Sequence, residues 1–359
     1  MGNIVFITNS ISFGGAAKML CFVATSLAKR GHKVHIVNLR TTANETDYER
    51  TLDEAVCYHL LEEKGRKAQI AGIKKIAKEA NAQVLIGFTA LPNFLAKIVG
   101  DMLHIPSIMS ERGDPTRNIA PTFKAKLVCF LINCSKGGVF QTYGAMEYYS
   151  KGLQKRGVVI PNPIFVNGEV PDVDYENCEK SVVTVGRLDN EQKRYDIMIQ
   201  AFKLFSEKHP EYVLKLYGRG VDEKQIEQWV SDAGLCDKVK FMGLTTQPMQ
   251  DIACDGMFLI TSDYEGISNS LLEAMAVGLP CVSTDHTPGG ARLLITHGEN
   301  GLLAPVADSE KLANAMCQFA ENPDLAKKCG EKAKEVLTRF APDRIIDMWE
   351  EYILKLIKK

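Results

Sequence analysis

The chain has 359 residues, of which 45% are hydrophobic and 24% charged, a composition typical of a globular protein long enough for two domains. A net charge of −1 argues against a dedicated nucleic-acid binder. The ten cysteines form no C-x-x-C pair, which argues against a zinc site or a disulfide scaffold and predicts a reducing compartment.

The charge is distributed unevenly along the chain. Residues 1–163 contain 21 Lys and Arg against 12 Asp and Glu, a net charge of +9, whereas the remainder contains 22 against 32, a net charge of −10. A basic half joined to an acidic half indicates that one domain faces an anionic surface or substrate. Two solvated surfaces of different composition would give the same totals, so this alternative stays open.

The first half alternates runs typical of buried strands with helical patterns. The apolar run 4–7 predicts a strand, and Gly14-Gly15 follow in a loop that opens a helix over 16–28. A strand at 33–37 completes a βαβ unit, whose first turn lacks the G-x-G-x-x-G spacing of dinucleotide-binding folds. Further strands are expected at 84–87, 107–109 and 158–160, helices near 68–80 and 92–103, and a polar loop at 110–115.

The motif Pro161-Asn162-Pro163 predicts a stiff hinge, after which the alternation begins again. Strands are expected at 181–185, 213–217, 239–242, 257–260 and 281–284, with helices at 197–207 and near 342–358. The pattern predicts an α/β fold with two doubly wound parallel-sheet (Rossmann-like) domains facing each other across a cleft. The expected domains are residues 1–163 and 164–341, with 342–359 a C-terminal helix that packs back on the first domain.

The stretch 257–280 combines a strand, a polar turn and a helix. Residues 266–270 (G-I-S-N-S) supply turn residues and candidate N-caps, and the N–H groups at the start of the helix form an anion site. Glu265 and Glu273 stand on either side of this turn. Carboxylates beside an anion site suit a ligand with phosphate in its middle and hydroxyl groups at both ends, such as a nucleotide-sugar. Alternatively, Ser270 and Glu273 form a capping box, and Glu265 is an ordinary solvated acid.

Two cations follow an earlier strand in the same way. Arg187 comes directly after the strand 181–185, and Lys193 lies six residues later. Cations at the carboxyl edge of a sheet can neutralise a diphosphate leaving group, although each alone is more often a solvated surface charge. Gly218 follows the next strand, where a glycine either lets the backbone approach a nucleotide or forms a tight turn.

Together these motifs resemble a family-4-type glycosyltransferase with the GT-B architecture, and the likeness covers nearly the whole chain. It rests on Gly14-Gly15, on the hinge prolines, on Gly186-Arg187-Leu188 with Lys193, and on the Glu-x7-Glu pair of Glu265 and Glu273. The loop at 111–115 (E-R-G-D-P) is similar to a segment of members that build polysaccharides and lipid-linked oligosaccharides. The chain departs from the family at Ala17-Lys18, where many members have an acid or an amide.

The resemblance implies a role for each matching residue. The equivalents of Arg187 and Lys193 hold the donor diphosphate, that of Glu265 meets the sugar hydroxyls, and that of Glu273 binds the ribose. Arg187, Lys193 and Glu265 are therefore the expected catalytic residues. The expected donor-binding residues are Gly14, Gly15, Gly186, Gly218, Gly266, Ile267, Ser268, Asn269, Ser270 and Glu273, and the expected acceptor-side residues are Lys18, Glu111 and Arg112.

The reaction that the resemblance implies is a retaining transfer of a hexose or N-acetylhexosamine from a UDP-sugar to a glycan acceptor. The acceptor is expected to be lipid-linked, in the synthesis of surface polysaccharides or glycoconjugates. Because the leaving diphosphate would take the acceptor's proton, the scheme needs no covalent nucleophile, no metal and no cofactor beyond the substrate. Two alternatives stay open: a nucleotide-sugar epimerase of the same architecture, and a non-catalytic scaffold that binds a nucleotide-sugar.

Contact with a membrane is expected at the surface only. No apolar run reaches the ~18 residues that span a bilayer, so the protein is expected in the cytoplasm, with the inner face of the cytoplasmic membrane as its peripheral site. Basic and aromatic residues interleave between positions 123 and 156 and could rest on anionic lipid. Equally, these aromatic residues could be core residues of helices whose outer faces carry the lysines.

Overall fold

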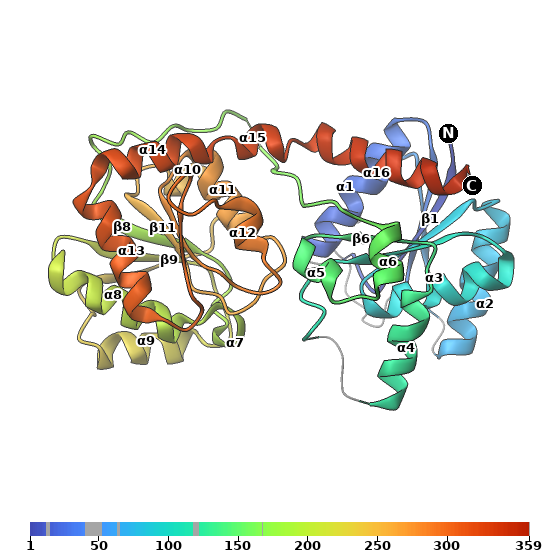
Figure 1. Cartoon of the computed structure of the whole chain (residues 1–359), viewed down its shortest axis with the longest axis horizontal. Helices are drawn as coiled ribbons and strands as arrows, with labels where there is room; N and C mark the ends of the chain where they lie inside the picture. The colour runs from blue at the N-terminus through green and yellow to red at the C-terminus, as the bar shows by residue number, and fades with distance from the viewer. Residues whose placement is uncertain (12–14, 40–51, 63–64, 118–121, 167, 359) are drawn as a thin grey trace. The chain divides into compact units, whose positions relative to one another are not determined.

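The computed structural model describes residues 1–11, 15–39, 52–62, 65–117, 122–166 and 168–358. It divides into two compact units (Figure 1). Unit 1 comprises Met1–Asn162 and Pro342–Lys359, and unit 2 comprises Pro163–Ala341. Within the described residues each unit has a sheet whose neighbouring strands all run parallel, so the predicted α/β class with two parallel-sheet domains is confirmed.

Unit 1 is built on a sheet with the strand order β3-β2-β1-β4-β5-β6-β7. The chain steps outward from β1 in one direction and from β4 in the other, which is the doubly wound arrangement. The strands are β1 Asn3–Thr8, β2 Lys33–Asn38, β3 Val56–Leu60, β4 Val84–Phe88, β5 Ser107–Glu111, β6 Gly137–Phe140 and β7 Gly157–Val159.

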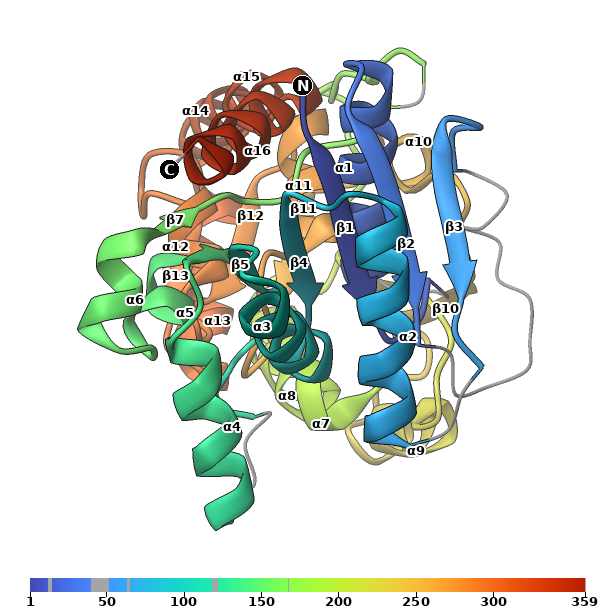
Figure 2. The same ribbon diagram turned by 90° about the vertical axis from the view of Figure 1, so that its right-hand side faces the viewer.

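Helices cover both faces of this sheet. They are α1 Gly15–Lys29, α2 Arg66–Glu79, α3 Ala90–Leu103, α4 Phe123–Asn133, α5 Tyr143–Glu147, α6 Lys151–Arg156 and α16 Pro342–Ile357. Successive side chains of a strand point to opposite faces. Ile4 and Phe6 of β1 therefore pack with α1 and α16, whereas Val5 and Ile7 pack with α2 and α3, which Figure 2 shows in front of the strands.

The last helix of the chain, α16, belongs to unit 1. Its Trp349 is fully buried and stacks on Phe88 of β4, with ring centroids 5.8 Å apart. Glu350 accepts a hydrogen bond from Arg30 at 2.6 Å, and the Tyr352 hydroxyl accepts one from the backbone N–H of Gly138 at 2.9 Å. The chain therefore returns to unit 1 after it has completed unit 2.

Several strands of unit 1 differ from the prediction, which did not include β3. Ser110 and Glu111, expected in a polar loop, are the last two residues of β5 and are buried. Strand β6 was not predicted, because it begins with two glycines, which usually indicate a turn. A Cβ on Gly137 would collide with the hydroxyl of Tyr352, so the close approach of α16 accounts for glycine there.

Unit 2 is built on a second parallel sheet, with the order β10-β9-β8-β11-β12-β13. Its strands are β8 Ser181–Val185, β9 Val213–Tyr217, β10 Val239–Gly243, β11 Met257–Ile260, β12 Cys281–Thr284 and β13 Leu302–Ala304. The order moves outward from β8 on one side and from β11 on the other, so this sheet is also doubly wound.

The helices of unit 2 form a layer on each face of its sheet. They are α7 Asn190–Lys193, α8 Tyr195–Lys208, α9 Glu223–Asp232, α10 Pro248–Ile252, α11 Asn269–Val277, α12 Gly290–Leu294, α13 Ser309–Glu321, α14 Pro323–Ala333 and α15 Val336–Arg339. Leu259 of β11 packs with α8 and α13 on one face, and its neighbours Phe258 and Ile260 pack with α11 on the other.

Gly218 holds two strand ends of unit 2 close together. Its φ is +144°, and a Cβ there would collide with the carbonyl oxygen of Gly186. We predict that Gly218→Ala lowers the free energy of unfolding by at least ~2 kcal/mol more than Gly234→Ala. Gly234 is the matched control, because its φ is also positive, at +72°, but nothing lies within 4 Å of a Cβ built on it. Equal losses in urea unfolding would show that the collision is not what requires glycine.

Candidate functional site

The candidate site lies at the carboxyl edge of the unit 2 sheet. The strand order changes direction between β8 and β11, and ligands of doubly wound sheets bind at the carboxyl ends of the strands beside such a switch point. Arg187 and Lys193 follow β8, and Glu265 follows β11. The topology therefore brings the three predicted catalytic residues to one edge.

Glu265 is the buried carboxylate of this site. Its Oε1 accepts hydrogen bonds from Nζ of Lys193 and, at 2.7 Å, from Oγ of Ser262. Burial favours the protonated form, but the positive charge of Lys193 outweighs it and lowers the pKa of Glu265 to about 2. Glu265 is therefore an ionised hydrogen-bond acceptor at neutral pH, held in a setting that is only 7% exposed.

The turn that carries Lys193 is tied to the loop that carries Glu265. The hydroxyl of Thr261 donates to the carbonyl oxygen of Lys193 at 2.8 Å. The next residue, Arg194, pairs with Asp263 at 2.6 Å. These bonds position the two segments independently of the ion pair itself, so the ammonium and the carboxylate are preorganised by the surrounding backbone.

Arg187 occupies a different environment, at the surface of unit 2. Its side chain is 71% exposed, and Nη2 donates to Oε1 of Gln192 at 3.2 Å. Most of the guanidinium therefore remains accessible to a ligand. An exposed cation of this kind can bind the end of an anionic ligand that lies nearer to solvent. Lys193 can bind the part of the same ligand that lies next to Glu265.

The N-cap of helix α11 lies two residues before the position that the capping-box alternative requires. Ser268 is its N-cap, since the Ser268 hydroxyl accepts from the backbone N–H of Leu271 at 3.4 Å. Ser270 therefore lies inside the first turn, and Glu273 lies in the second turn, where it is half-buried. The capping-box interpretation of Glu273 is wrong. The first-turn N–H groups have no intrahelical acceptor, as at any helix start.

Glycines allow close backbone contacts around the site. Gly186 lies beside the Lys193 side chain, since a Cβ there would stand 3.6 Å from Nζ. A Cβ on Gly290, at the start of α12, would collide with the carbonyl oxygen of Gly266. Gly218 is explained by its contact with Gly186, which favours a packing role over direct approach to a nucleotide.

Two polar residues of the site, Ser262 and His286, were not among the predicted site residues. His286 is fully buried, and neither ring nitrogen has a hydrogen-bond partner of good geometry within the described residues. Burial lowers its pKa in spite of the nearby Glu265 carboxylate, so the ring is neutral at neutral pH and offers one donor and one acceptor. Each of the two residues stands two positions after a strand end, a spacing that could have identified both.

The predicted site residues of unit 1 lie in separate environments. Gly14 and Gly15 were expected on the donor side, and Lys18, Glu111 and Arg112 on the acceptor side. Gly14 lies outside the described residues, Gly15 is the first residue of α1, and Lys18 is half-buried in the same helix. Glu111 ends β5, and its carboxylate is occupied by internal bonds. It accepts from the Tyr149 hydroxyl at 2.7 Å and from the backbone N–H of Arg112 at 3.0 Å.

Arg112 is buried next to Glu111 with part of its guanidinium unsatisfied. Its Nη2 donates to Oδ1 of Asn162, and the guanidinium lies over the Phe88 ring, 5.9 Å from the centroid. Nε and Nη1 are buried without a hydrogen-bond partner in the part of the chain that the structure describes. Burial lowers the pKa of Arg112 to about 9, so the group is charged at neutral pH. A buried cation with unsatisfied donors suits an anionic ligand group.

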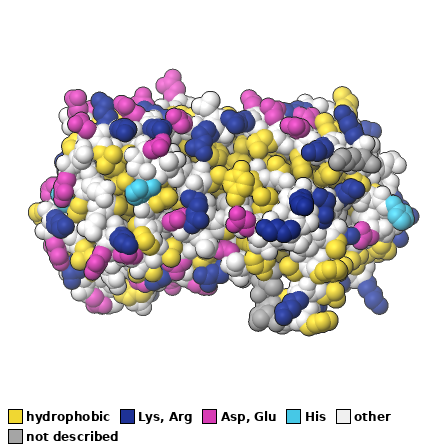
Figure 3. All heavy atoms as spheres, in the orientation of Figure 1, with side chains coloured by type: hydrophobic (Ala, Val, Ile, Leu, Met, Phe, Trp, Pro, Cys, Tyr) yellow, Lys and Arg dark blue, Asp and Glu magenta, His cyan; other side chains and the backbone are white. Residues whose placement is uncertain are grey.

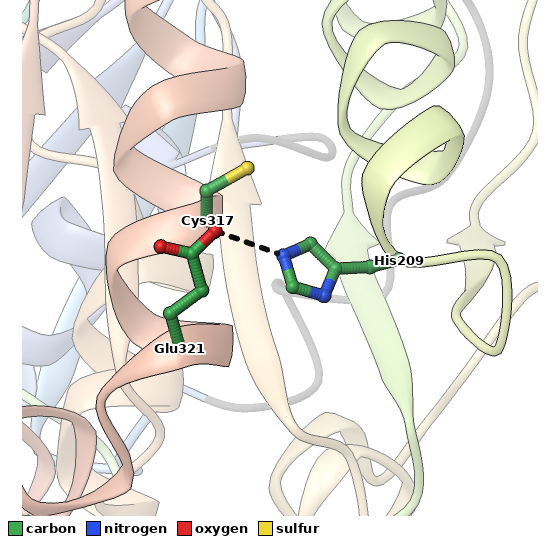
Figure 4. A group of neighbouring side chains, drawn as sticks. All are labelled: His209, Cys317 and Glu321. Carbon is green, nitrogen blue, oxygen red and sulfur yellow. Dashed lines mark ion pairs between the residues drawn. The ribbon is translucent and has the colours of Figure 1, made fainter.

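A second cluster of unit 2 has ligand types that suit a metal ion (Figure 4). Its members are His209, Cys317 and Glu321, whose ligand atoms lie within 4.8 Å of one another. His209 directly follows α8, at the amino edge of the sheet, and therefore lies away from the candidate site. Nε2 of His209 lies 3.4 Å from Oε1 of Glu321, and the apolar packing between α8 and α13 accounts for the proximity of these side chains.

The chain is similar to known proteins over all or part of its length. Residues 174–336 match the model of the family described as glycosyl transferases group 1, and this span includes the whole candidate site of unit 2. An exopolysaccharide phosphotransferase of Streptomyces coelicolor is 36% identical over 168 residues, which cover 46% of this chain but only 18% of that protein. The N-acetyl-alpha-D-glucosaminyl L-malate synthase of Bacillus anthracis is 25% identical over 364 residues, covering 94% of this chain and 93% of that enzyme.

Among solved structures, Anabaena HepE in complex with UDP is similar along the whole chain. The TM-score is 0.85 at 19% identity, and the match covers 98% of this chain and 99% of HepE. At this identity the likeness shows that the two proteins share a fold.

The pKa of Glu265 makes a prediction about stability. Because its folded value of about 2 lies below the usual 4.5, the ionised carboxylate contributes stability that is complete above about pH 4.5 and is lost as the pH falls towards 2. The difference in unfolding free energy between wild type and Glu265→Gln should therefore be constant near neutrality and shrink on acidification. Urea unfolding at several pH values measures it, with the exposed Glu227→Gln as control. A difference that grows in acid would contradict the assignment.

Proposed function

We propose that the chain is a retaining glycosyltransferase of the GT-B fold that uses a UDP-sugar, since residues 174–336 match the glycosyl transferases group 1 family and the chain shares its fold with HepE. It would transfer a hexose or an N-acetylhexosamine to a glycan acceptor. The observation that carries this proposal is the ion pair of the half-buried Lys193 with the buried Glu265 at the switch point of the unit 2 sheet, with the exposed Arg187 nearby in sequence.

In the proposed reaction the bond between the anomeric carbon and the donor's diphosphate oxygen breaks. The acceptor oxygen bonds to the anomeric carbon on the same face, and its proton passes to the leaving diphosphate. Lys193 and Arg187 stabilise the charge that develops on the diphosphate. Glu265, ionised and buried, accepts hydrogen bonds from the sugar hydroxyls and thereby orients the sugar. Glu273 would bind the ribose, and residues 266–270 would offer backbone N–H groups to the phosphate.

The scheme uses no metal ion and no cofactor other than the donor. UDP is the nucleotide bound in the HepE complex, which supports a uridine donor here. The name of the Streptomyces relative supports an acceptor that belongs to polysaccharide synthesis.

We further propose that the acceptor is lipid-linked and is used at the cytoplasmic face of the membrane. Two features of unit 1 support this. The unsatisfied Nε and Nη1 of Arg112 suit a phosphate or another anion of the acceptor. A cavity of about 260 Å³, lined mainly by apolar side chains of α4 and by Tyr149, lies next to Glu111 and suits an apolar group.

The first test is the release of nucleoside diphosphate from a panel of nucleotide-sugars. Release from one UDP-sugar that rises with a membrane lipid extract, and not with L-malate, is the expected result. Isomerisation of the donor without release would favour the epimerase alternative, and binding of the donor without either reaction would favour the scaffold. Release that rises only with L-malate would contradict a glycan acceptor.

Replacement of Lys193 tests the assignment of the charge-stabilising group. Lys193→Ala should lower turnover by roughly 10²-fold or more, because one preorganised cation next to the leaving group is lost. The substitution Lys240→Ala, at an exposed lysine of the same unit, is the control and should leave turnover unchanged. Turnover of Lys193→Ala within twofold of the control would remove this role. A circular dichroism spectrum of each variant shows whether the fold is retained.

A further inference from the structure

Helix α4 presents a stripe of large apolar side chains to solvent. Phe123 is 84% exposed, Leu127 49% and Phe130 64%. Their spacing of four and three residues places them on one side of the helix. Figures 1 and 2 both show α4 extending away from the rest of unit 1. The stripe therefore contributes little to the packing of the domain.

The opposite side of α4 holds the helix to unit 1. Ile132 is buried there, and Val128 and Cys129 line the cavity next to Glu111. At the end of the helix, the Asn133 side chain accepts from the backbone N–H of Ser150 at 2.7 Å. These contacts fix the orientation of α4, so the exposed stripe is a constant feature of the surface.

Lysines flank the stripe on both sides. With ~100° of rotation per residue, Lys124 and Lys126 fall on opposite sides of the line through Phe123 and Phe130, and both are exposed. The helix contains no Asp or Glu, and Lys136 follows it closely. Figure 3 shows apolar and basic side chains together over the region of α4. An apolar stripe between cationic side chains is the pattern of a helix that lies in a membrane interface.

We propose that α4 docks unit 1 onto an anionic bilayer, with Phe123, Leu127 and Phe130 inserted at the boundary between headgroups and acyl chains and with Lys124 and Lys126 on the lipid phosphates. None of the described helices has the length and apolar content of a bilayer-spanning segment. The net charge of +9 over residues 1–163 complements an anionic surface.

A second copy of the chain fits this surface less well. Two α4 stripes packed against each other would bring the flanking lysines of both copies together, and like charges across an interface oppose association. The bilayer is therefore the occupant that satisfies both the apolar and the charged parts of the helix.

Flotation with vesicles tests the proposal. Wild type should bind vesicles of phosphatidylcholine with phosphatidylglycerol and bind phosphatidylcholine alone more weakly. The double variant Lys124→Gln with Lys126→Gln should lower the partition of the protein onto anionic vesicles about 30-fold. The double variant Phe123→Ser with Phe130→Ser should lower it at least about tenfold. Matched controls on unit 2 are Leu244→Ser, at a leucine that is 77% exposed, and the exposed Lys240→Gln, which should bind as wild type does.

Insertion itself is measured with Phe123→Trp. Its fluorescence should shift to the blue on anionic vesicles and be quenched by brominated lipid. The proposal would be overturned if the full chain did not bind anionic vesicles. It would also be overturned if neither of the two double variants of α4 changed that binding. An α4-dependent dimer in sedimentation velocity without vesicles would also overturn it and assign the stripe to a second copy.

This inference deepens the proposed function by naming the element that meets the membrane. The flotation assay contains neither donor nor acceptor, so its result is separate from the transfer reaction. The variant Phe123→Ser with Phe130→Ser should leave the hydrolysis of the UDP-sugar by water unchanged. Neither side chain lines the cavity proposed for the acceptor, and Arg187, Lys193 and Glu265 lie in unit 2.

Discussion

The ion pair between the half-buried Lys193 and the buried Glu265 is the interaction on which the rest of the candidate site depends. It joins the segment after β8 to the segment after β11, the two strands between which the sheet order changes direction. A buried carboxylate without its cation would be strongly unfavourable, so neither residue can be removed alone without a large cost. The supporting bonds of Thr261, Ser262 and Asp263 hold the pair in place. The neutral ring of His286, also buried, adds hydrogen-bonding capacity without adding charge.

Most of the fold could be predicted because parallel strands buried on both faces read as continuous apolar runs. The run at 257–260 coincides with β11, and the run at 4–7 lies within β1. The unpredicted strand β6 lacked this signal because its first two residues are glycines. The space of a side chain on Gly137 is taken by α16, and that on Gly138 by Phe140 and Leu153. Long-range packing of this kind cannot be read from local sequence. The same holds for Glu111, a charged residue that a strand accommodates only because Tyr149 and two backbone N–H groups are present.

The sequence predicted which residues form the candidate site better than it predicted their contacts and burial. The sequence placed Lys193 and Glu265 at one sheet edge, since the topology of a doubly wound fold requires it, but could not show that they pair. For the aromatic residues of unit 1, each of the two interpretations holds for some members. Phe140 and Tyr149 are core residues, whereas Phe123 and Phe130 are exposed. The period of a helix tells which residues share a side, but the tertiary contacts decide which side faces solvent.

The return of α16 to unit 1 has a consequence for how the chain folds during synthesis. Unit 2 is one continuous segment and can fold as soon as Ala341 has left the ribosome. Unit 1 is made first, yet it lacks Trp349 and Tyr352, which cover Phe88 and pack against Gly137, until the final residues emerge. The earlier-made domain therefore waits, with one apolar face of its sheet partly uncovered, for the later one to be completed. Nascent chains that stop before α16 should be the forms that most need chaperones.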